Sequence, residues 1–107
     1  MSYSVQFTPE AARQLRALRA SDWVKIADKC QRILSVNPTM TSKARIKRLR
    51  DDVFPPYRLR VDDYRVFYDV EEEKQTVMIY AVIDKSQAAE WIAAQQEKKR
   101  DENDNDQ

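Results

Sequence analysis

The clearest pattern in the chain is a strict alternation of apolar and other side chains between residues 57 and 68. A period of two predicts two strands, and Asp62-Asp63 between them predicts a two-residue hairpin loop. In that register Arg60 lies directly opposite Arg65. Because like charges that face each other destabilise a sheet, the pair favours a site that holds an anion between them.

The N-terminal third predicts a short strand at Tyr3–Phe7 followed by two helices. Thr8 and Pro9 are typical of a helix start, with threonine as the N-cap and proline in the first turn. Apolar residues then recur at three- and four-residue steps as far as Leu34. The very short connection between the two helices favours an antiparallel helical hairpin.

The second half of the chain predicts a sheet and a final helix. Strands are expected at residues 44–50 and 75–83, on either side of the hairpin, and a short helix is expected from Ser86. The predicted fold is α+β: a small, mostly antiparallel sheet with helices on one face. We expect residues 1–97 to form one domain and the charged residues 98–107 to form a disordered tail.

The register of the last two strands decides which side chain lies beside the arginines. A four-residue turn at residues 71–74 would pair Arg65 with Tyr80 and place the tyrosine next to the arginine pair. A slip of one residue would move Tyr80 to the core face instead.

The composition limits the chemistry. The chain has no histidine, no glycine and one cysteine, Cys30. The commonest general base is therefore missing, a zinc site is improbable, and glycine-rich phosphate loops are excluded. We expect no metal and no cofactor. The chain also lacks a stretch of about 20 apolar residues and a signal-peptide pattern, which predicts a cytoplasmic protein without membrane contact.

Basic residues concentrate around the hairpin, although the formal net charge is only +1. A guanidinium is permanently charged and binds two phosphate oxygens at once, so the arginine cluster is a candidate site for a phosphodiester. A solvated strand face is the plainer interpretation of the same alternation. Lys85, at the end of the last strand, could belong either to the cluster or to the start of the final helix.

The sequence resembles the RelE/ParE superfamily of toxin–antitoxin toxins from residue 3 to about residue 95. The resemblance rests on Leu49 in a basic strand, on Tyr57-Arg-Leu-Arg-Val and on Asp63-Tyr-Arg-Val-Phe-Tyr, followed by an apolar strand and a short helix. It implies an antiparallel sheet packed on a helical hairpin. For RelE-like members it also implies that basic residues bind mRNA in the ribosomal A site, where the ribose 2′-hydroxyl attacks the adjacent phosphate without metal.

The resemblance therefore implies a metal-independent endoribonuclease that inhibits translation and is silenced by a cognate antitoxin. The residues that would act in cleavage are Arg58, Arg60, Arg65 and Lys85. Those that would bind RNA around them are Arg45, Lys47, Arg48, Arg50 and Tyr80.

Two positions depart from RNA-cleaving relatives. Lys85 stands where they usually have an arginine, and Trp91 stands where some carry a catalytic tyrosine. Tyr80 and Lys85 are candidates for the general base by elimination. The departures support an alternative, a ParE-like inhibitor of DNA gyrase without nuclease activity. A degenerate member that only binds its antitoxin is a third interpretation.

Overall fold

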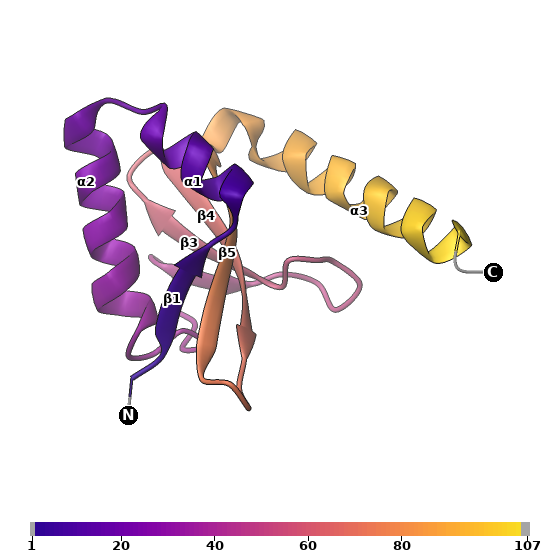
Figure 1. The fold of residues 1–107 in the computed structure, drawn as a ribbon, viewed down its shortest axis with the longest axis horizontal. Coiled ribbons are helices and arrows are strands. Elements are labelled where there is room, and N and C mark those ends of the chain that lie inside the picture. Colours follow the sequence, from indigo (N-terminus) through magenta and orange to yellow (C-terminus); the bar gives the residue numbers. More distant parts are fainter. Residues whose placement is uncertain (1, 106–107) are drawn as a thin grey trace.

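The computed structural model describes residues 2–105, and its centre is a twisted five-stranded sheet (Figure 1). The strand order is β1-β5-β4-β3-β2. β1 pairs with β5 in parallel, and the other neighbours are antiparallel. The predicted α+β class is confirmed. The strands are β1 (Ser4–Phe7), β2 (Ile46–Arg48), β3 (Tyr57–Val61), β4 (Tyr64–Glu71) and β5 (Thr76–Asp84).

Two consecutive helices follow β1, as the sequence predicts. Thr8 caps the first of them, because its hydroxyl oxygen accepts a hydrogen bond from the Ala11 amide at 3.1 Å. The second continues into a π-helical turn that carries the buried Cys30. The helical segments are α1 (Pro9–Arg16), α2 (Ala20–Lys29), the π-helix η1 (Cys30–Leu34), the 3₁₀-helix η2 (Lys85–Gln87) and α3 (Ala88–Asn105).

The main core lies between the sheet and the first two helices. Leu59, Val66 and Ile79 of the central strands are fully buried there, together with Ala11 of α1. Alternation along β3 and β4 places these residues on one face, and burial of their apolar surface drives the packing.

The opposite face of the sheet carries a second, smaller apolar cluster. Phe67, Ala81 and Ile83 are buried under α3, and the ring of Phe67 stacks on Trp91 with centroids 5.1 Å apart. The prediction of helices on one face only is wrong in this respect. An aromatic residue in the middle of β4 has to be covered, and Ile92 joins Trp91 in covering it.

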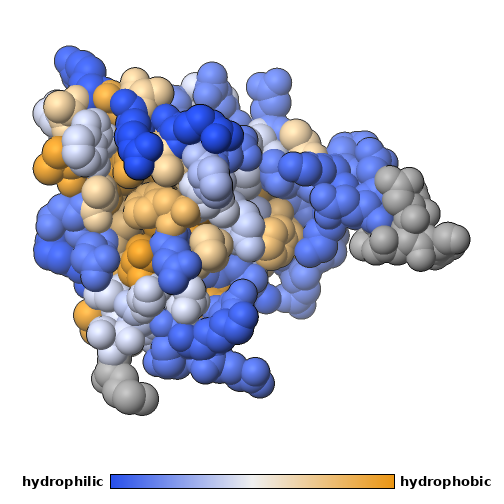
Figure 2. Space-filling model, in the orientation of Figure 1, coloured by the Kyte–Doolittle hydropathy of each residue, from blue (hydrophilic) through white to orange (hydrophobic). Residues whose placement is uncertain are grey.

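α3 projects away from the body of the molecule (Figure 1). Its projecting part is hydrophilic in the view of Figure 2. The helix continues past Glu97 to Asn105, into the segment for which the sequence predicts a disordered tail. Residues 106–107 of that tail lie outside the described residues, and the domain boundary stays a prediction. Within residues 2–105, no helix combines the length and apolar character needed to cross a membrane.

The turn between β4 and β5 lies one residue later than predicted. Glu71 pairs with Thr76, and Gln75 closes the turn with a positive φ of 48°. A β-bulge then interrupts the pairing between Phe67 and Tyr68. The bulge adds an extra residue to β5, and no sequence pattern announces it.

Candidate nucleic-acid interface

The arginine hairpin forms in the predicted register. Arg60 lies opposite Arg65, and the loop is Asp62-Asp63. Asp62 adopts the left-handed conformation, with φ of 52°, which aspartate tolerates better than most residues. Lys25 of α2 pairs with the Asp62 carboxylate, and their hydrogen bond lowers the pKa of that carboxyl group. This contact ties the hairpin loop to the helical layer.

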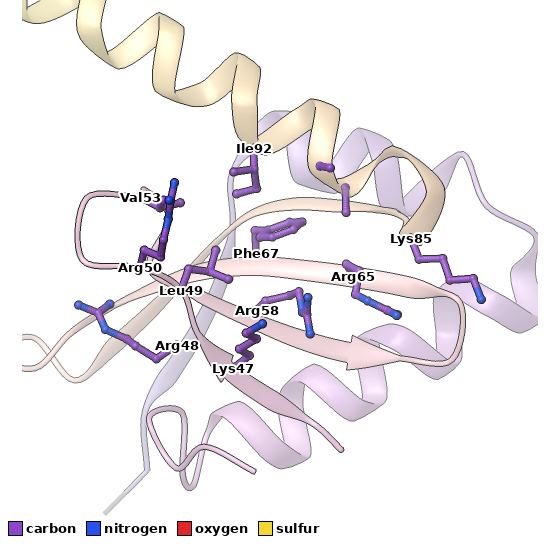
Figure 3. A pocket seen from close by; sticks show the side chains of 12 residues that line it. Lys47, Arg48, Leu49, Arg50, Val53, Arg58, Arg65, Phe67, Lys85 and Ile92 are labelled. Atoms are coloured by element: carbon purple, nitrogen blue, oxygen red, sulfur yellow. The ribbon is translucent and has the colours of Figure 1, made fainter. Parts of the chain in front are cut away.

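The face of the sheet that carries the arginines is divided in two. Lys47, Arg58 and Phe67 lie side by side on β2, β3 and β4. α3 covers the apolar part around Phe67, and the cationic part on β2 and β3 is left open. Figure 3 shows this division, with Ile92 of α3 above Phe67 and with Lys47 and Arg58 beside it.

A groove of about 710 Å³ runs along this division, and we call it the central groove. Its walls are the three strands, the loop between β2 and β3, and the first turns of α3 (Figure 3). None of its described lining residues is acidic. Its cationic lining residues are Lys47, Arg48, Arg50, Arg58, Arg65 and Lys85.

Among the cations of the central groove, Arg58 has a charged side chain that its surroundings disfavour. The side chain is half-buried, and its Nε is buried without a hydrogen-bond partner among the described residues. Burial lowers the pKa of Arg58, and the like charges of Arg65 and Arg60 lower it further. A buried N–H without an acceptor is costly, so an anion in the groove would relieve both the unmet hydrogen bond and the repulsion.

Arg65 and Lys85 are fixed by the hairpin loop. The Nη1 of Arg65 donates to the carbonyl oxygens of Asp62 and Tyr64, at 3.0 and 2.9 Å. Lys85 donates its backbone N–H to the Asp63 carbonyl at 2.7 Å, and its Nζ lies 3.3 Å from the Asp63 carboxylate. Both partners of this ion pair are exposed, so it holds Lys85 only weakly.

A second groove, of about 660 Å³, lies at the outer edge of β2, and we call it the edge groove. It shares Lys47, Arg48 and Arg58 with the central groove and adds Lys43 and Arg60. The structure does not bring the side chains of Arg60 and Arg65 into one groove, although the sequence predicts a shared site. The backbones of the two arginines pair, but their side chains line different grooves, and Arg58 lies in both.

Two other predicted RNA-binding residues lie elsewhere. Arg45, which directly precedes β2, lines a separate groove with Val36 and Met40. Tyr80 is the extra residue of the β-bulge, and the later turn and the bulge together place Ile83, not Tyr80, opposite Arg65. The ring of Tyr80 packs edge-on against Phe54, with centroids 5.1 Å apart.

Sequence reasoning missed the walls of the central groove and the contribution of Lys43. Leu49, Val53 and Ile92 contribute apolar side chains to the lining, and they come from a loop and from α3. In the sequence, the only indication of these apolar residues was Phe67, whose apolar ring lies on a strand face that otherwise carries cations and needs apolar neighbours to cover it. Trp91 stacks on Phe67 and does not line the groove, so its role is packing.

The chemistry available in the central groove is electrostatic. Arginine and lysine bind anions, and none of the described lining residues is a carboxylate, a tyrosine or a cysteine that could accept a proton. Within residues 2–105, no group of three or more carboxylate or thiol side chains could hold a metal ion. The groove can therefore bind and stabilise negative charge.

Comparison with known families matches residues 5–89 to the family described as ParE toxin of type II toxin-antitoxin system, parDE. No curated protein matches the chain. Among solved structures, the RelBE2 toxin–antitoxin complex from Mycobacterium tuberculosis is similar. It is 27% identical, covers 78% of this chain and 92% of that chain, and has a TM-score of 0.66.

Two further structures share the fold. A mutant E. coli toxin RelE in the free state is 24% identical, covers 92% of this chain and 98% of that chain, and has a TM-score of 0.69. The archaeal RelE–RelB complex from Pyrococcus horikoshii is 24% identical and has a TM-score of 0.63. The match covers 78% of this chain and 96% of that chain. Because the family match spans most of its length, the chain belongs to the ParE toxin family, within the RelE/ParE superfamily of type II toxin–antitoxin toxins.

Proposed function

We propose that this toxin is a ribosome-dependent mRNA endonuclease whose central groove binds the scissile phosphate. One observation carries the proposal. Arg58, Arg65 and Lys47 line a single groove without an acidic residue among its described lining, and the buried Nε of Arg58 has no partner there. A phosphodiester supplies both the negative charge and the acceptor oxygens that this arrangement requires.

The proposed reaction needs little more than charge stabilisation from the protein. The ribose 2′-oxygen attacks the adjacent phosphorus, the bond to the 5′-oxygen breaks, and a 2′,3′-cyclic phosphate and a 5′-hydroxyl result. The pentacoordinate intermediate is more negative than the substrate, and the guanidinium groups of Arg58 and Arg65 stabilise it. Lys85, at the end of the groove, neutralises the leaving oxygen.

The described lining of the groove has no carboxylate, tyrosine or cysteine to accept the proton of the 2′-hydroxyl, and the proposal assigns Lys85, the other candidate base, to the leaving oxygen instead. We assign proton transfer to groups of the ribosome or of the RNA, which would make cleavage depend on the ribosome. Tyr80 is withdrawn as a candidate base, because it lies at Phe54 and not in the groove.

A cognate antitoxin is part of the proposal, since similar solved toxins are in complexes with one. An acidic segment of the antitoxin would neutralise the cations of the central groove and exclude RNA from it. Cytoplasmic location follows from a target on the ribosome.

The test compares Arg65→Ala with Arg13→Ala, which removes an exposed charge from α1. After induction in cells, mRNA 5′ ends on ribosomes are mapped. We expect Arg65→Ala to reduce cleavage by about 100-fold or more, the usual effect of removing a group that stabilises the transition state. Arg13→Ala should cleave normally. Full cleavage by a folded Arg65→Ala protein would contradict the proposal.

A second candidate function is inhibition of DNA gyrase. The family match is to ParE toxins, and the absence of a carboxylate, tyrosine or cysteine from the described groove lining suits a protein that binds without chemistry. Purified toxin would then block supercoiling by gyrase while ribosomal mRNA stays intact. Intact supercoiling together with cleaved mRNA would exclude this candidate.

A further inference from the structure

A third pocket, of about 320 Å³, is lined by α3, β5, the start of α1 and the loop between β2 and β3, and we call it the aromatic pocket. Phe54, Tyr80 and Trp91 contribute three aromatic rings to it, more than line either cationic groove. We infer that the aromatic pocket binds an uncharged nucleoside whose base stacks on these rings. The inference does not depend on the proposed function, because none of the described residues of this pocket lines the central or the edge groove.

The β-bulge of β5 brings Tyr80 to the aromatic pocket. Ile79 and Val82 are both buried in the main core, and the two residues between them lie on the side of α3. Of these two, Ala81 packs under α3, and Tyr80 lines the pocket together with Trp91. Bulges commonly redirect a side chain at a functional site, and here the bulge adds a ring to a pocket.

Contacts within the protein already hold the three rings in place. The ring of Phe54 meets Tyr80 edge-on, with centroids 5.1 Å apart, and the Nζ of Lys99 lies 4.1 Å from its centroid. The indole of Trp91 stacks on Phe67 at an interplanar angle of 23°. A ligand that enters the aromatic pocket therefore meets walls that it does not have to order, which lowers the cost of binding.

The charges around the aromatic pocket balance one another, unlike those of the two cationic grooves. Its charged lining residues are Glu10, Lys98, Lys99 and Glu102. All four are exposed, and none forms an ion pair within 4.0 Å among the described residues. The ammonium groups donate hydrogen bonds and the carboxylates accept them. The pocket thus offers both kinds of partner without the net positive charge that would select a phosphate.

A nucleobase matches both the walls and the polar groups. Its faces stack on aromatic side chains, and its edge carries hydrogen-bond donors and acceptors together. A nucleoside brings no charge of its own, in keeping with the balanced charges of Glu10, Lys98, Lys99 and Glu102. The volume lies near the lower end of the range of small-molecule sites, about 300–1,000 Å³, which suits one nucleoside better than an oligonucleotide.

The experiment titrates the purified, ¹⁵N-labelled full chain with adenosine, guanosine, cytidine and uridine, and follows the amide and indole N–H signals by NMR. The chain has two tryptophans, so the indole of Trp23, on α2 and outside the pocket, is an internal control. Tyr80→Leu removes one ring of the pocket. The matched variant Tyr3→Leu removes a ring outside it, and the spectrum of each variant verifies its folding.

We expect the Trp91 indole and the side-chain amide of Gln95 to shift saturably with at least one nucleoside at millimolar concentration, while Trp23 does not shift. Tyr80→Leu should weaken this binding about tenfold, within the usual effect of removing a ring on which a base stacks. Tyr3→Leu should bind as the unmodified chain does.

Several results would overturn the inference. They are equal shifts of Trp23 and Trp91, no saturable shift of Trp91 with any of the four nucleosides, and unchanged affinity in a folded Tyr80→Leu protein. Should Tyr80→Leu fail to fold, the pattern of shifts in the unmodified chain decides alone.

Two charged probes test the class of ligand. Adenosine monophosphate carries a phosphate, and free tryptophan carries an ammonium and a carboxylate group. We expect both to bind more weakly than the best nucleoside, because the charges of the pocket already balance. Tighter binding of either probe would overturn the choice of an uncharged nucleoside. None of these results bears on mRNA cleavage, which Arg65→Ala tests separately.

Discussion

In the proposed function, Arg58 serves binding at the expense of the ligand-free fold. Its Nε is buried without a partner among the described residues, and its charge faces those of Arg60 and Arg65. Both effects disfavour the charged side chain in the folded protein, as the lowered pKa of Arg58 indicates. Such conflicts between stability and function are common at binding sites.

We therefore expect Arg58→Met to stabilise the protein and to impair phosphate binding. Methionine keeps most of the aliphatic stem and removes the charge and the unmet N–H. Thermal denaturation should show a melting temperature higher by about 2–4 °C, the shift expected for roughly 0.5 kcal/mol in a domain of this size. The matched variant Arg13→Met should leave it unchanged. A lower melting temperature for Arg58→Met would show that the guanidinium stabilises the ligand-free protein.

At the scale of elements, the wall of the central groove depends on how α3 is attached. Gln96 accepts a hydrogen bond from the Phe54 amide at 3.0 Å and donates one to the Phe54 carbonyl at 2.7 Å. Lys99 adds a cation–π contact, with its Nζ 4.1 Å from the centroid of the Phe54 ring. The loop between β2 and β3 and the middle of α3 are thereby joined.

Gln96→Ala should loosen this attachment without unfolding the domain. Two partly buried hydrogen bonds contribute about 1–3 kcal/mol together, and their loss should speed amide exchange at Phe54 by about tenfold or more. Hydrogen–deuterium exchange over residues 49–56 and 88–100 measures the effect. Gln95→Ala, one position earlier on the same helix, is the control. Unchanged exchange at Phe54 would mean that the other contacts of α3, such as Trp91 with Phe67 and Lys99 with Phe54, hold it without Gln96.

The sequence was sufficient for those elements whose geometry is set locally. The alternation at residues 57–68 and the Asp62-Asp63 loop determine the hairpin register, and Thr8-Pro9 marks the start of α1. The register of β5 could not be predicted, because the bulge near Tyr80 depends on packing against α3 and Phe54. The later turn and the bulge together removed Tyr80 from the site.

The candidate site was predictable in its charge but not in its shape. Basic residues on adjacent strands identify the face, since alternation alone places them there. Which groove each side chain lines depends on the loop around Val53 and on α3, which are distant in the sequence. For this reason Arg60 and Arg65 separate although they pair in the sheet.

At the scale of the whole molecule, buried ionisable groups determine the response to alkaline pH. The Tyr68 hydroxyl donates to the Pro38 carbonyl at 2.6 Å in the core, and burial raises its pKa. Burial also raises the pKa of the Cys30 thiol to about 12. Above their unfolded pKa values, about 10 for tyrosine and 8.5 for cysteine, the folded state retains protons that the unfolded state loses. The free energy of unfolding therefore falls as pH rises.

Tyr68→Phe should reduce this dependence. At neutral pH the variant loses about 1–3 kcal/mol, because the Pro38 carbonyl is left buried without its donor. Above pH 10, its free energy of unfolding should fall less steeply than that of the unmodified chain, by about 1.4 kcal/mol per pH unit. Urea denaturation between pH 7 and pH 11 measures both quantities. Parallel curves for the two proteins would show that Tyr68 ionises as easily in the folded state as in the unfolded one.

The parallel pairing of β1 with β5 has a consequence for folding during translation. Ser4 of β1 pairs with Thr76 of β5, so this pairing cannot form until Thr76 has been translated. Ile92, which lines the central groove, is translated later still. In a nascent chain β1 therefore stays unpaired until residues 76–79 have been translated, and the complete groove forms only after Ile92 has been translated as well.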